Sequence, residues 1–210
     1  LYNKTEGNPL YIQQLLVSFK ERNLLWFDKK KNEWVWKLSE ISKEAVSDNV
    51  ANLLIKKIKN LPKTSQKTLH YASLLGRRFN PSDIADITNQ DLISIELSLW
   101  HATSKKLIVE INPNSQTNQY KFLHDKIQHA CMTDNQFNLT KSHSTVGKAL
   151  LSKFGKDTSS KNLGNIVHHL NKSIGLLNNM ELIDLIYLNK TYGDQLLKNL
   201  SDISAEKYYT

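Results

Sequence analysis

Few residues in this sequence have the types and the spacing that chemistry needs. Gly7-Asn8-Pro9 fits a tight turn into a helix, because glycine permits unusual backbone angles, asparagine caps free N–H groups and proline suits the first helical position. Such a turn is rigid, and a flat ring could lie against the proline. The simpler interpretation is an ordinary helix start. His124-Asp125 forms a second such start, where the helix dipole favours the carboxylate and the histidine could act as a local cap.

The other reactive side chains do not form a catalytic or metal-binding motif. The sequence contains no glycine-rich phosphate loop, no Gly-x-Ser-x-Gly and no His-Glu-x-x-His. His168 and His169 are adjacent on an apolar helix, where neighbours point about 100° apart, and scattered acids with one cysteine cannot complete a site. Cys131, the one cysteine, favours a reducing compartment and is expected to be a small buried side chain. We therefore expect no catalysis from these residues alone.

Length and composition allow one large or two small globular domains. The chain has 210 residues, of which 40% are hydrophobic, and it begins at Leu1 rather than Met, which favours a fragment of a longer protein. No apolar run is long enough to span a membrane and no secretory signal is visible, so we expect a cytoplasmic protein. The net charge of +8 suits nucleic acid, an anionic membrane or a nucleotide. The densest basic groups, at 29–31 and 56–59, are typical of solvated faces.

The first sixty residues are predicted to combine helices with an aromatic hairpin. Apolar spacing predicts a helix over 8–23, a hairpin of strands 24–27 and 34–36, and a helix over 49–60 that Ser47 or Asp48 caps. Trp34 and Trp36 fall on one face and are expected to pack together. Such a pair could stack nucleobases, although packing in a core or an interface is the commoner use.

The next segment is predicted to have the order of a winged helix-turn-helix. Helices over 65–75, 82–88 and 91–103 precede strands over 107–111 and 120–122. Gly76 is expected to end the first helix, and Leu92, Ile95, Leu99 and Ala102 are expected to face inward on the third. In a DNA-binding protein the helix over 91–103 would read the bases. Its face is mostly apolar and carries Asp91 and Glu96, whereas base readout needs Arg, Lys, Asn or Gln. Specific DNA binding is therefore not the favoured function.

From residue 123 onwards every predicted element is a helix. The pattern predicts helices that begin near 124, 138, 163 and 182, with a further helix starting near 204. The third carries an apolar stripe at Leu163, Ile166, Val167, Leu170, Ile174 and Leu177. Short antiparallel helices with short connections are typical of an α-solenoid of the TPR-like kind. The predicted fold class is therefore mainly α, with small β-hairpins.

Five short motifs, in this order, carry a resemblance to a known family. They are Glu6-Gly-Asn-Pro-Leu-Tyr-Ile-Gln-Gln-Leu-Leu16, Trp34-x-Trp36, Asp48-Asn49-Val50, Leu61-Pro62 and Phe122-x-His124-Asp125-Lys126-Ile127-Gln128. The sequence resembles the C-terminal half of a STAND-type signalling ATPase module of the AAA+ superfamily. More specifically, it looks like the predicted ATPase between a serine/threonine-kinase-like domain and a sensor histidine kinase in large signalling proteins.

The resemblance implies a division into three parts and a nucleotide site. A helical lid with the aromatic hairpin would occupy 1–60, a winged helix 61–137 and the start of helical repeats 138–210. The turn Gly7-Asn8-Pro9 would lie against adenine. His124, with Asp125 beside it, would contact the β-phosphate of ADP, and Leu123 replaces the usual Met of that motif.

The resemblance also implies the cofactor and the partners. ATP or ADP would bind together with Mg supplied by the missing N-terminal half, which would carry the phosphate loop. That half, kinase and sensor domains of the same protein, and protein ligands on the helical tail are the implied partners, with no membrane.

Three functions remain open at this point. The first is the regulatory part of a nucleotide-dependent signalling switch whose parent is an ATPase linked to a histidine or serine/threonine kinase. The second is a winged-helix transcriptional regulator. The third is a non-catalytic helical scaffold for protein–protein interaction.

Overall fold

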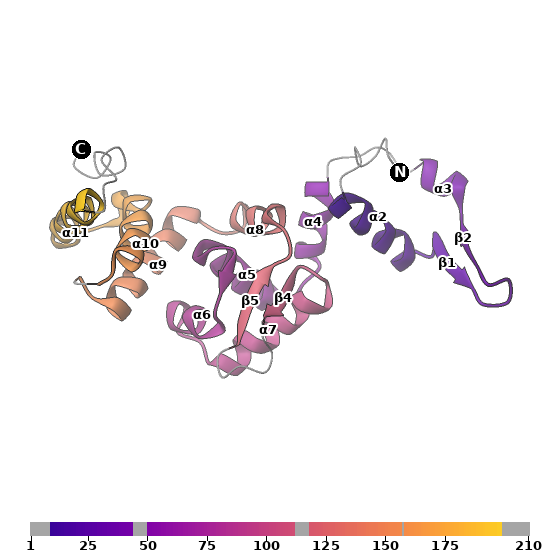
Figure 1. Cartoon of the computed structure of the whole chain (residues 1–210), viewed down its shortest axis with the longest axis horizontal. Coiled ribbons are helices and arrows are strands. Elements are labelled where there is room, and N and C mark those ends of the chain that lie inside the picture. The colour runs from indigo at the N-terminus through magenta and orange to yellow at the C-terminus, as the bar shows by residue number, and fades with distance from the viewer. Residues whose placement is uncertain (1–8, 44–49, 112–117, 157, 199–210) are drawn as a thin grey trace. The chain divides into compact units, whose positions relative to one another are not determined.

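The computed structural model describes residues 9–43, 50–111, 118–156 and 158–198, and this part of the chain is mainly helical (Figure 1). The predicted mainly α fold class is confirmed. Two compact units divide between Asn60 and Leu61. The predicted subdivision of the second unit near residue 137 stays a prediction. Within the described ranges, none of the helices combines the length and the apolar character needed to cross a membrane.

The first unit contains the predicted helix and hairpin. Its elements are α2 (Pro9–Glu21), β1 (Leu25–Asp28), β2 (Glu33–Trp36), α3 (Leu38–Lys43) and α4 (Val50–Lys59). The strands pair antiparallel, and the backbone N–H groups of Lys30 and Lys31 donate to Asp28 Oδ1 at 2.9 and 3.3 Å across the turn. Asn32 closes that turn at φ 54°, a left-handed conformation that asparagine tolerates. The proposed caps Ser47 and Asp48 lie outside the described residues.

The aromatic side chains of the hairpin lie at the surface of this unit. Trp34 and Trp36 are 51% and 56% exposed, so they do not form a core. Trp34 makes its ring contact with Phe27, edge to face at 5.5 Å, and not with Trp36 as expected. The reason is that Phe27 and Trp34 are cross-strand partners, which lie closer together than side chains two residues apart on one strand.

The second unit begins with the predicted order of three helices and a hairpin. Its first elements are α5 (Lys63–Leu75), β3 (Arg78–Phe79), α6 (Pro81–Thr88), α7 (Leu92–Ser104), β4 (Ile108–Ile111) and β5 (Gln119–Phe122). The sheet has the order β3-β5-β4 with antiparallel neighbours. Gly76 ends α5 at φ 121°, as its type predicted. The strand β3 was not predicted, since two residues carry no detectable periodicity.

A continuous apolar core supports these helices. α5 packs on α6, α7 and α8 (Asp125–Met132). The fully buried side chains include Leu69, Ile84, Ile95, Leu99, Phe122 and Ile127. Cys131 is also buried on α8, as expected. Leu92 was expected to face inward and is instead 44% exposed, because the buried face of α7 centres on positions 95, 98, 99 and 102.

The remaining helices form a second apolar layer. They are α9 (Leu139–Phe154), α10 (Ser160–Asn171) and α11 (Asn179–Lys198), with a 3₁₀ turn η1 (Ile174–Leu176) before the last. α10 packs against both α9 and α11. The predicted stripe is confirmed at Leu163, Ile166, Val167 and Leu170. It is wrong at Ile174, which is 55% exposed because α10 ends before it. The helix expected from residue 204 lies outside the described residues.

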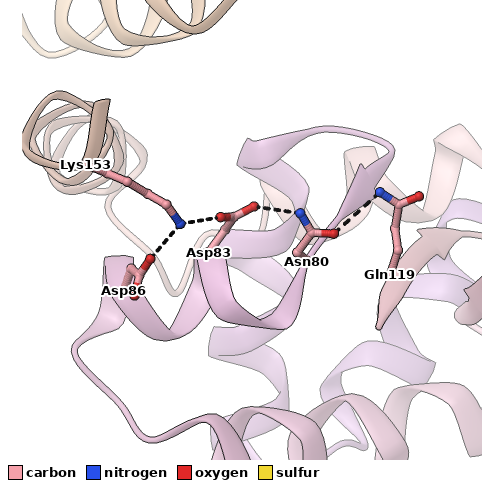
Figure 2. A network of polar contacts seen from close by, with 5 residues as sticks. All are labelled: Asn80, Asp83, Asp86, Gln119 and Lys153. Carbon is pink, nitrogen blue, oxygen red and sulfur yellow. Dashed lines mark hydrogen bonds and ion pairs between the residues drawn. The ribbon is translucent and has the colours of Figure 1, made fainter. Parts of the chain in front are cut away.

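A chain of polar contacts joins α9 to α6 and to β5 (Figure 2). Lys153 Nζ lies 2.8 Å from Asp83 Oδ1 and 2.7 Å from Asp86 Oδ2. Asn80 donates to Asp83 at 3.2 Å, and Gln119 donates to Asn80 at 3.5 Å. The hydrogen bonds to the two carboxylates raise the pKa of Lys153. These contacts fix α9 on α6 within the second unit.

Candidate functional site

The first candidate site residue, Pro9, is the first residue of α2. Its side chain is exposed, and the helix that it begins is held by the buried ring of Phe19. Proline has no N–H to lose at this position, so the sequence starts the helix here without cost. Gly7 and Asn8 lie outside the described residues, so their turn stays a prediction.

The second candidate, His124, is the N-cap of α8. The buried side chains of Phe122 and Ile127 fix the chain on both sides of it. Its Nδ1 accepts a hydrogen bond from the backbone N–H of Lys126 at 3.1 Å. The local capping role that the sequence left open is therefore present. Because Nδ1 accepts, a neutral ring carries its hydrogen on Nε2, which leaves an N–H donor directed away from the helix.

Charged side chains surround this cap. Asp125 lies in the first turn of α8, and its Oδ1 is 3.4 Å from Arg77 Nε. Both side chains are more than half exposed, so the ion pair adds little stability. Lys126 is an exposed cationic residue two positions after His124, and Arg77 pairs with Asp125, the residue that follows His124. The structure thus places an Asp125–Arg77 ion pair at the residue next to the cap.

Pro9 and His124 belong to different units. Their predicted convergence on one nucleotide therefore stays a prediction. Within the described stretches, no group of three His, Cys, Asp or Glu side chains could hold a metal ion.

Sequence reasoning missed a buried histidine in the second unit. His70 on α5 is fully buried, and its ring stacks on Phe137 at 4.5 Å. Its Nδ1 lies 3.1 Å from the carbonyl oxygen of Cys131 and therefore donates. Its Nε2 lies 2.8 Å from Ser142 Oγ. Burial lowers the pKa of His70, so the ring ties α5 to α8 and α9 in its neutral form.

A pair of histidines joins α9 to α10. His143 Nδ1 and His169 Nδ1 lie 2.8 Å apart, so one nitrogen must donate and the other accept. Burial is the main cause that lowers the pKa of His143 to about 4 and that of His169 to about 3. Both rings are therefore neutral near pH 7. His168 is exposed, which agrees with the predicted divergence of the two adjacent side chains.

A signal for this pair was present in the sequence. His143 precedes Val146 and Leu150 at helical spacing, and His169 adjoins the stripe at Leu170. Both positions therefore fall on buried faces. The contact itself depends on the packing of two helices, which spacing alone does not give.

The first unit also has an apolar groove of about 610 Å³ between α2, the hairpin and α3. Trp34, Trp36, Leu16 and Leu38 line it, and Lys20 is its one charged lining residue among those described. The two indoles, offered in the sequence as possible stacking platforms, are walls of this groove.

Comparison with known proteins gives two matches, both to very large signalling kinases. The chain is similar to hybrid signal transduction histidine kinase G of Dictyostelium discoideum, with 26% identity over 72% of this chain and 5% of that protein. It is also similar to the peroxide stress-activated histidine kinase mak3 of Schizosaccharomyces pombe, with 24% identity over 64% of this chain and 6% of that protein. The chain thus corresponds to a small part of the length of these relatives. No family model matches, and no solved structure does.

Proposed function

We propose that this chain is a regulatory, non-catalytic module of a signal-transduction protein of the histidine-kinase class. The observation that carries the proposal is the match of most of the chain to a short stretch of two such kinases. A mainly helical module without a recognisable catalytic motif suits coupling between domains better than chemistry.

We further propose that the module takes part in a nucleotide-dependent switch of the STAND type. Pro9 would contact the adenine of ATP or ADP, and His124 would contact a phosphate. The exposed ring of Pro9, on a backbone that proline itself fixes, supports the first contact. The Nε2–H of His124, with Lys126 two residues further on and Arg77 paired to the adjacent Asp125, supports the second.

The proposed switch depends on a difference in the affinity of the nucleotide for different arrangements of the two units. A nucleotide that touches both units stabilises only those arrangements in which both contacts can form, and it shifts the equilibrium by that difference in affinity. Mg and the phosphate loop would come from the N-terminal half of the same protein. The winged-helix order of α5, α6, α7 and the β4–β5 hairpin would supply the moving part.

The DNA-binding alternative is weaker. The helix that would enter the major groove, α7, turns Ile93, Leu97 and Trp100 to solvent. Apolar side chains of this size do not read base edges, which present hydrogen-bonding groups. The scaffold alternative requires only the helical layers, so it is the one that an experiment must separate from the switch.

The test uses the full-length parent protein loaded with radiolabelled ADP. His124→Asn keeps a good N-cap for α8 and removes the imidazole donor, so ADP release should accelerate roughly 10- to 150-fold, the effect of one lost charge-assisted bond. Pro9→Ala should accelerate release roughly 2- to 5-fold through lost ring contact. Signalling output should rise in parallel.

Matched controls are His129→Asn, at an exposed position on the same helix, and Pro62→Ala, at another exposed proline before a helix. Neither should alter ADP release. If both test variants release ADP at the parent rate, the scaffold function stands and the switch does not.

A further inference from the structure

The sheet of the second unit has one buried face and one face turned outward. Phe79, Tyr120 and Phe122 are buried, so their side of the sheet is the inner one. Because side chains alternate along a strand, Arg78 on β3 and Lys121 on β5 lie on the other side, which we call the outer face (β4 and β5 are labelled in Figure 1). Arg78 is exposed and Lys121 is partly exposed, so both can reach a partner.

Arg78 and Lys121 are direct cross-strand neighbours. The next pair along the ladder carries a backbone hydrogen bond, which the N–H of Phe122 donates to the carbonyl oxygen of Arg77 at 3.0 Å. Arg78 and Lys121 therefore form a non-hydrogen-bonded pair, the kind in which the Cβ atoms approach to roughly 5 Å. Like charges in this position destabilise a sheet, so the fold itself gains nothing from the pair.

A third cation, Lys106, lies at the same end of the sheet in an unfavourable backbone conformation. It is exposed and comes just before β4, which begins beside the end of β5 because Ile108 pairs with Phe122. Its φ is 56°, and the other three non-glycine residues with positive φ in the described ranges are asparagines. Lysine lacks the short polar side chain that supports this conformation. A strained residue of this kind points to a use outside the fold.

No acidic side chain within the described ranges offsets these charges. None of the ion pairs there involves Arg78, Lys106 or Lys121. Glu110 is the one acidic residue of the three strands, and as the cross-strand partner of Tyr120 it lies on the inner side. The outer face therefore presents positive charge that only another molecule can neutralise.

Apolar side chains lie among these cations. Val109 on β4 is the cross-strand partner of Lys121 and is partly exposed. Leu123, two residues after Lys121, is 41% exposed. A protein segment in which acidic and apolar residues alternate complements such a surface. A nucleic-acid backbone would offer its phosphates and sugars but nothing to cover the apolar groups.

We propose that the outer face binds an acidic segment of a protein partner, with Arg78, Lys121 and Lys106 holding its carboxylates. A carboxylate between Arg78 and Lys121 replaces their mutual repulsion by two charge-assisted contacts. The apolar side chains of the segment cover Val109 and Leu123. This contact does not depend on the nucleotide switch, because none of the three cations is assigned a nucleotide contact.

Fluorescence anisotropy of a fluorescein-labelled peptide of alternating glutamate and leucine, titrated with the full 210-residue chain, tests the proposal. Lys121→Glu turns an attraction into a repulsion and should raise the dissociation constant at least about fivefold. Lys106→Asn removes one exposed charge and should raise it about 2- to 5-fold. The matched control is Lys161→Glu, at an exposed position on α10, which should leave the dissociation constant unchanged.

Urea denaturation of the same variants separates a binding role from a structural one. Lys121→Glu places opposite charges across the strands, and Lys106→Asn suits the left-handed backbone. Neither variant should therefore lower the urea midpoint. Weaker binding by a chain of equal or higher stability cannot result from unfolding.

Binding that Lys121→Glu and Lys106→Asn weaken, and that is lost when glutamine replaces glutamate in the peptide, supports the proposal. No binding in about 50 mM salt, where surface charges are only weakly screened, overturns it. Binding that Lys121→Glu leaves unchanged also overturns it, as does equal weakening by Lys161→Glu, which would make net charge alone responsible. Tighter binding of duplex DNA than of the peptide, lost in Lys121→Glu, would instead make the outer face a nucleic-acid contact.

Discussion

Histidines in this protein serve different purposes according to what surrounds each ring. His124 is half-buried at a helix start, where its Nδ1 caps α8. His143 and His169 are buried against each other and share a hydrogen bond. Burial disfavours the charged forms of His143 and His169. Electrostatic repulsion from His168 and Lys172 lowers the pKa of His143 further.

We expect acid to destabilise the second unit through the His143–His169 pair. Their folded pKa values of about 4 and about 3 lie below the ordinary 6.5, so the unfolded chain binds more protons as pH falls below 6.5. The pair should lower the free energy of unfolding by on the order of 3 kcal/mol between pH 6.5 and 5, and the buried His70 adds to the fall. His143→Gln keeps a donor and removes one titrating ring, so it should remove roughly half of the part that comes from the pair.

Urea denaturation at a series of pH values measures this effect. His129→Gln, at an exposed position on α8, is the control and should keep the full pH dependence. A pH dependence in His143→Gln equal to that of the parent would contradict the assignment.

The sequence could predict the position of single residues better than their partners. His124 was expected at a helix start, and it lies there because local spacing defines that start. The bond from His143 to His169 spans 26 residues and arises only when α9 packs on α10. Likewise, Asp125 reaches Arg77 only because β5 pairs with β3, which brings the chain after β5 next to the start of β3.

At the scale of elements, two glycines show how closely the last helices approach one another. A Cβ on Gly147 of α9 would lie 2.7 Å from Leu170 Cδ2 and 3.2 Å from His169 Cβ on α10. A Cβ on Gly164 of α10 would lie 2.6 Å from the hydroxyl oxygen of Tyr192 on α11. Leu170 is buried and cannot move aside, whereas the end of a half-buried tyrosine can swing.

We therefore expect the same glycine-to-alanine substitution to have a large effect on stability at Gly147 and a small one at Gly164. Gly147→Ala should lower the free energy of unfolding by about 1–3 kcal/mol, because overpacking outweighs the helix propensity of alanine. Gly164→Ala should change it by less than about 1 kcal/mol, since the gain in propensity offsets the small shift of Tyr192. Urea titration followed by circular dichroism compares them. Equally small changes in both variants would mean that α9 and α10 do not pack this closely, and equally large losses would mean that Tyr192 cannot move aside.

Elements with a visible apolar period or alternation were predictable, and those without one were not. The helices α5, α9 and α11 repeat apolar residues over three or more turns, so their period is visible in the sequence. α3, β3 and η1 have six, two and three residues, too few to show a period. Leu92 was misassigned because it lies at the edge of the buried arc of α7, where spacing alone cannot separate inside from outside.

At the scale of the whole molecule, the second unit contains a complete core of its own. Its apolar cluster, with Val146, Ile166 and Leu188, comes from residues beyond Asn60, and so do the three strands of its sheet. We expect residues 61–210 to fold alone, with a cooperative urea transition. Gly147→Ala should shift that transition as much in the fragment as in the full chain, because distant sites contribute independently. A fragment without a cooperative transition would show that its core depends on residues 1–60.

The candidate nucleotide site belongs to this largest scale, which explains why sequence reasoning could propose it and not complete it. Each half depends on local structure, and the described halves, Pro9 and His124, both lie at helix starts. Whether they meet depends on how the two units are held, which local sequence patterns do not encode, and under the proposed function a bound nucleotide would select that arrangement.

The four tryptophans of the chain divide unequally between the units. Trp26, Trp34 and Trp36 belong to the hairpin, and Trp100 stands alone on α7. All four are more than one third exposed, so water reaches every indole in the free chain. The intrinsic fluorescence of the folded protein should therefore have the long-wavelength emission of a wetted indole. Binding that excludes water from the hairpin indoles or from Trp100 should shift the emission to shorter wavelength. A blue shift that persists in a Trp100→Phe variant comes from the hairpin, and one that disappears comes from α7, so no added dye is needed.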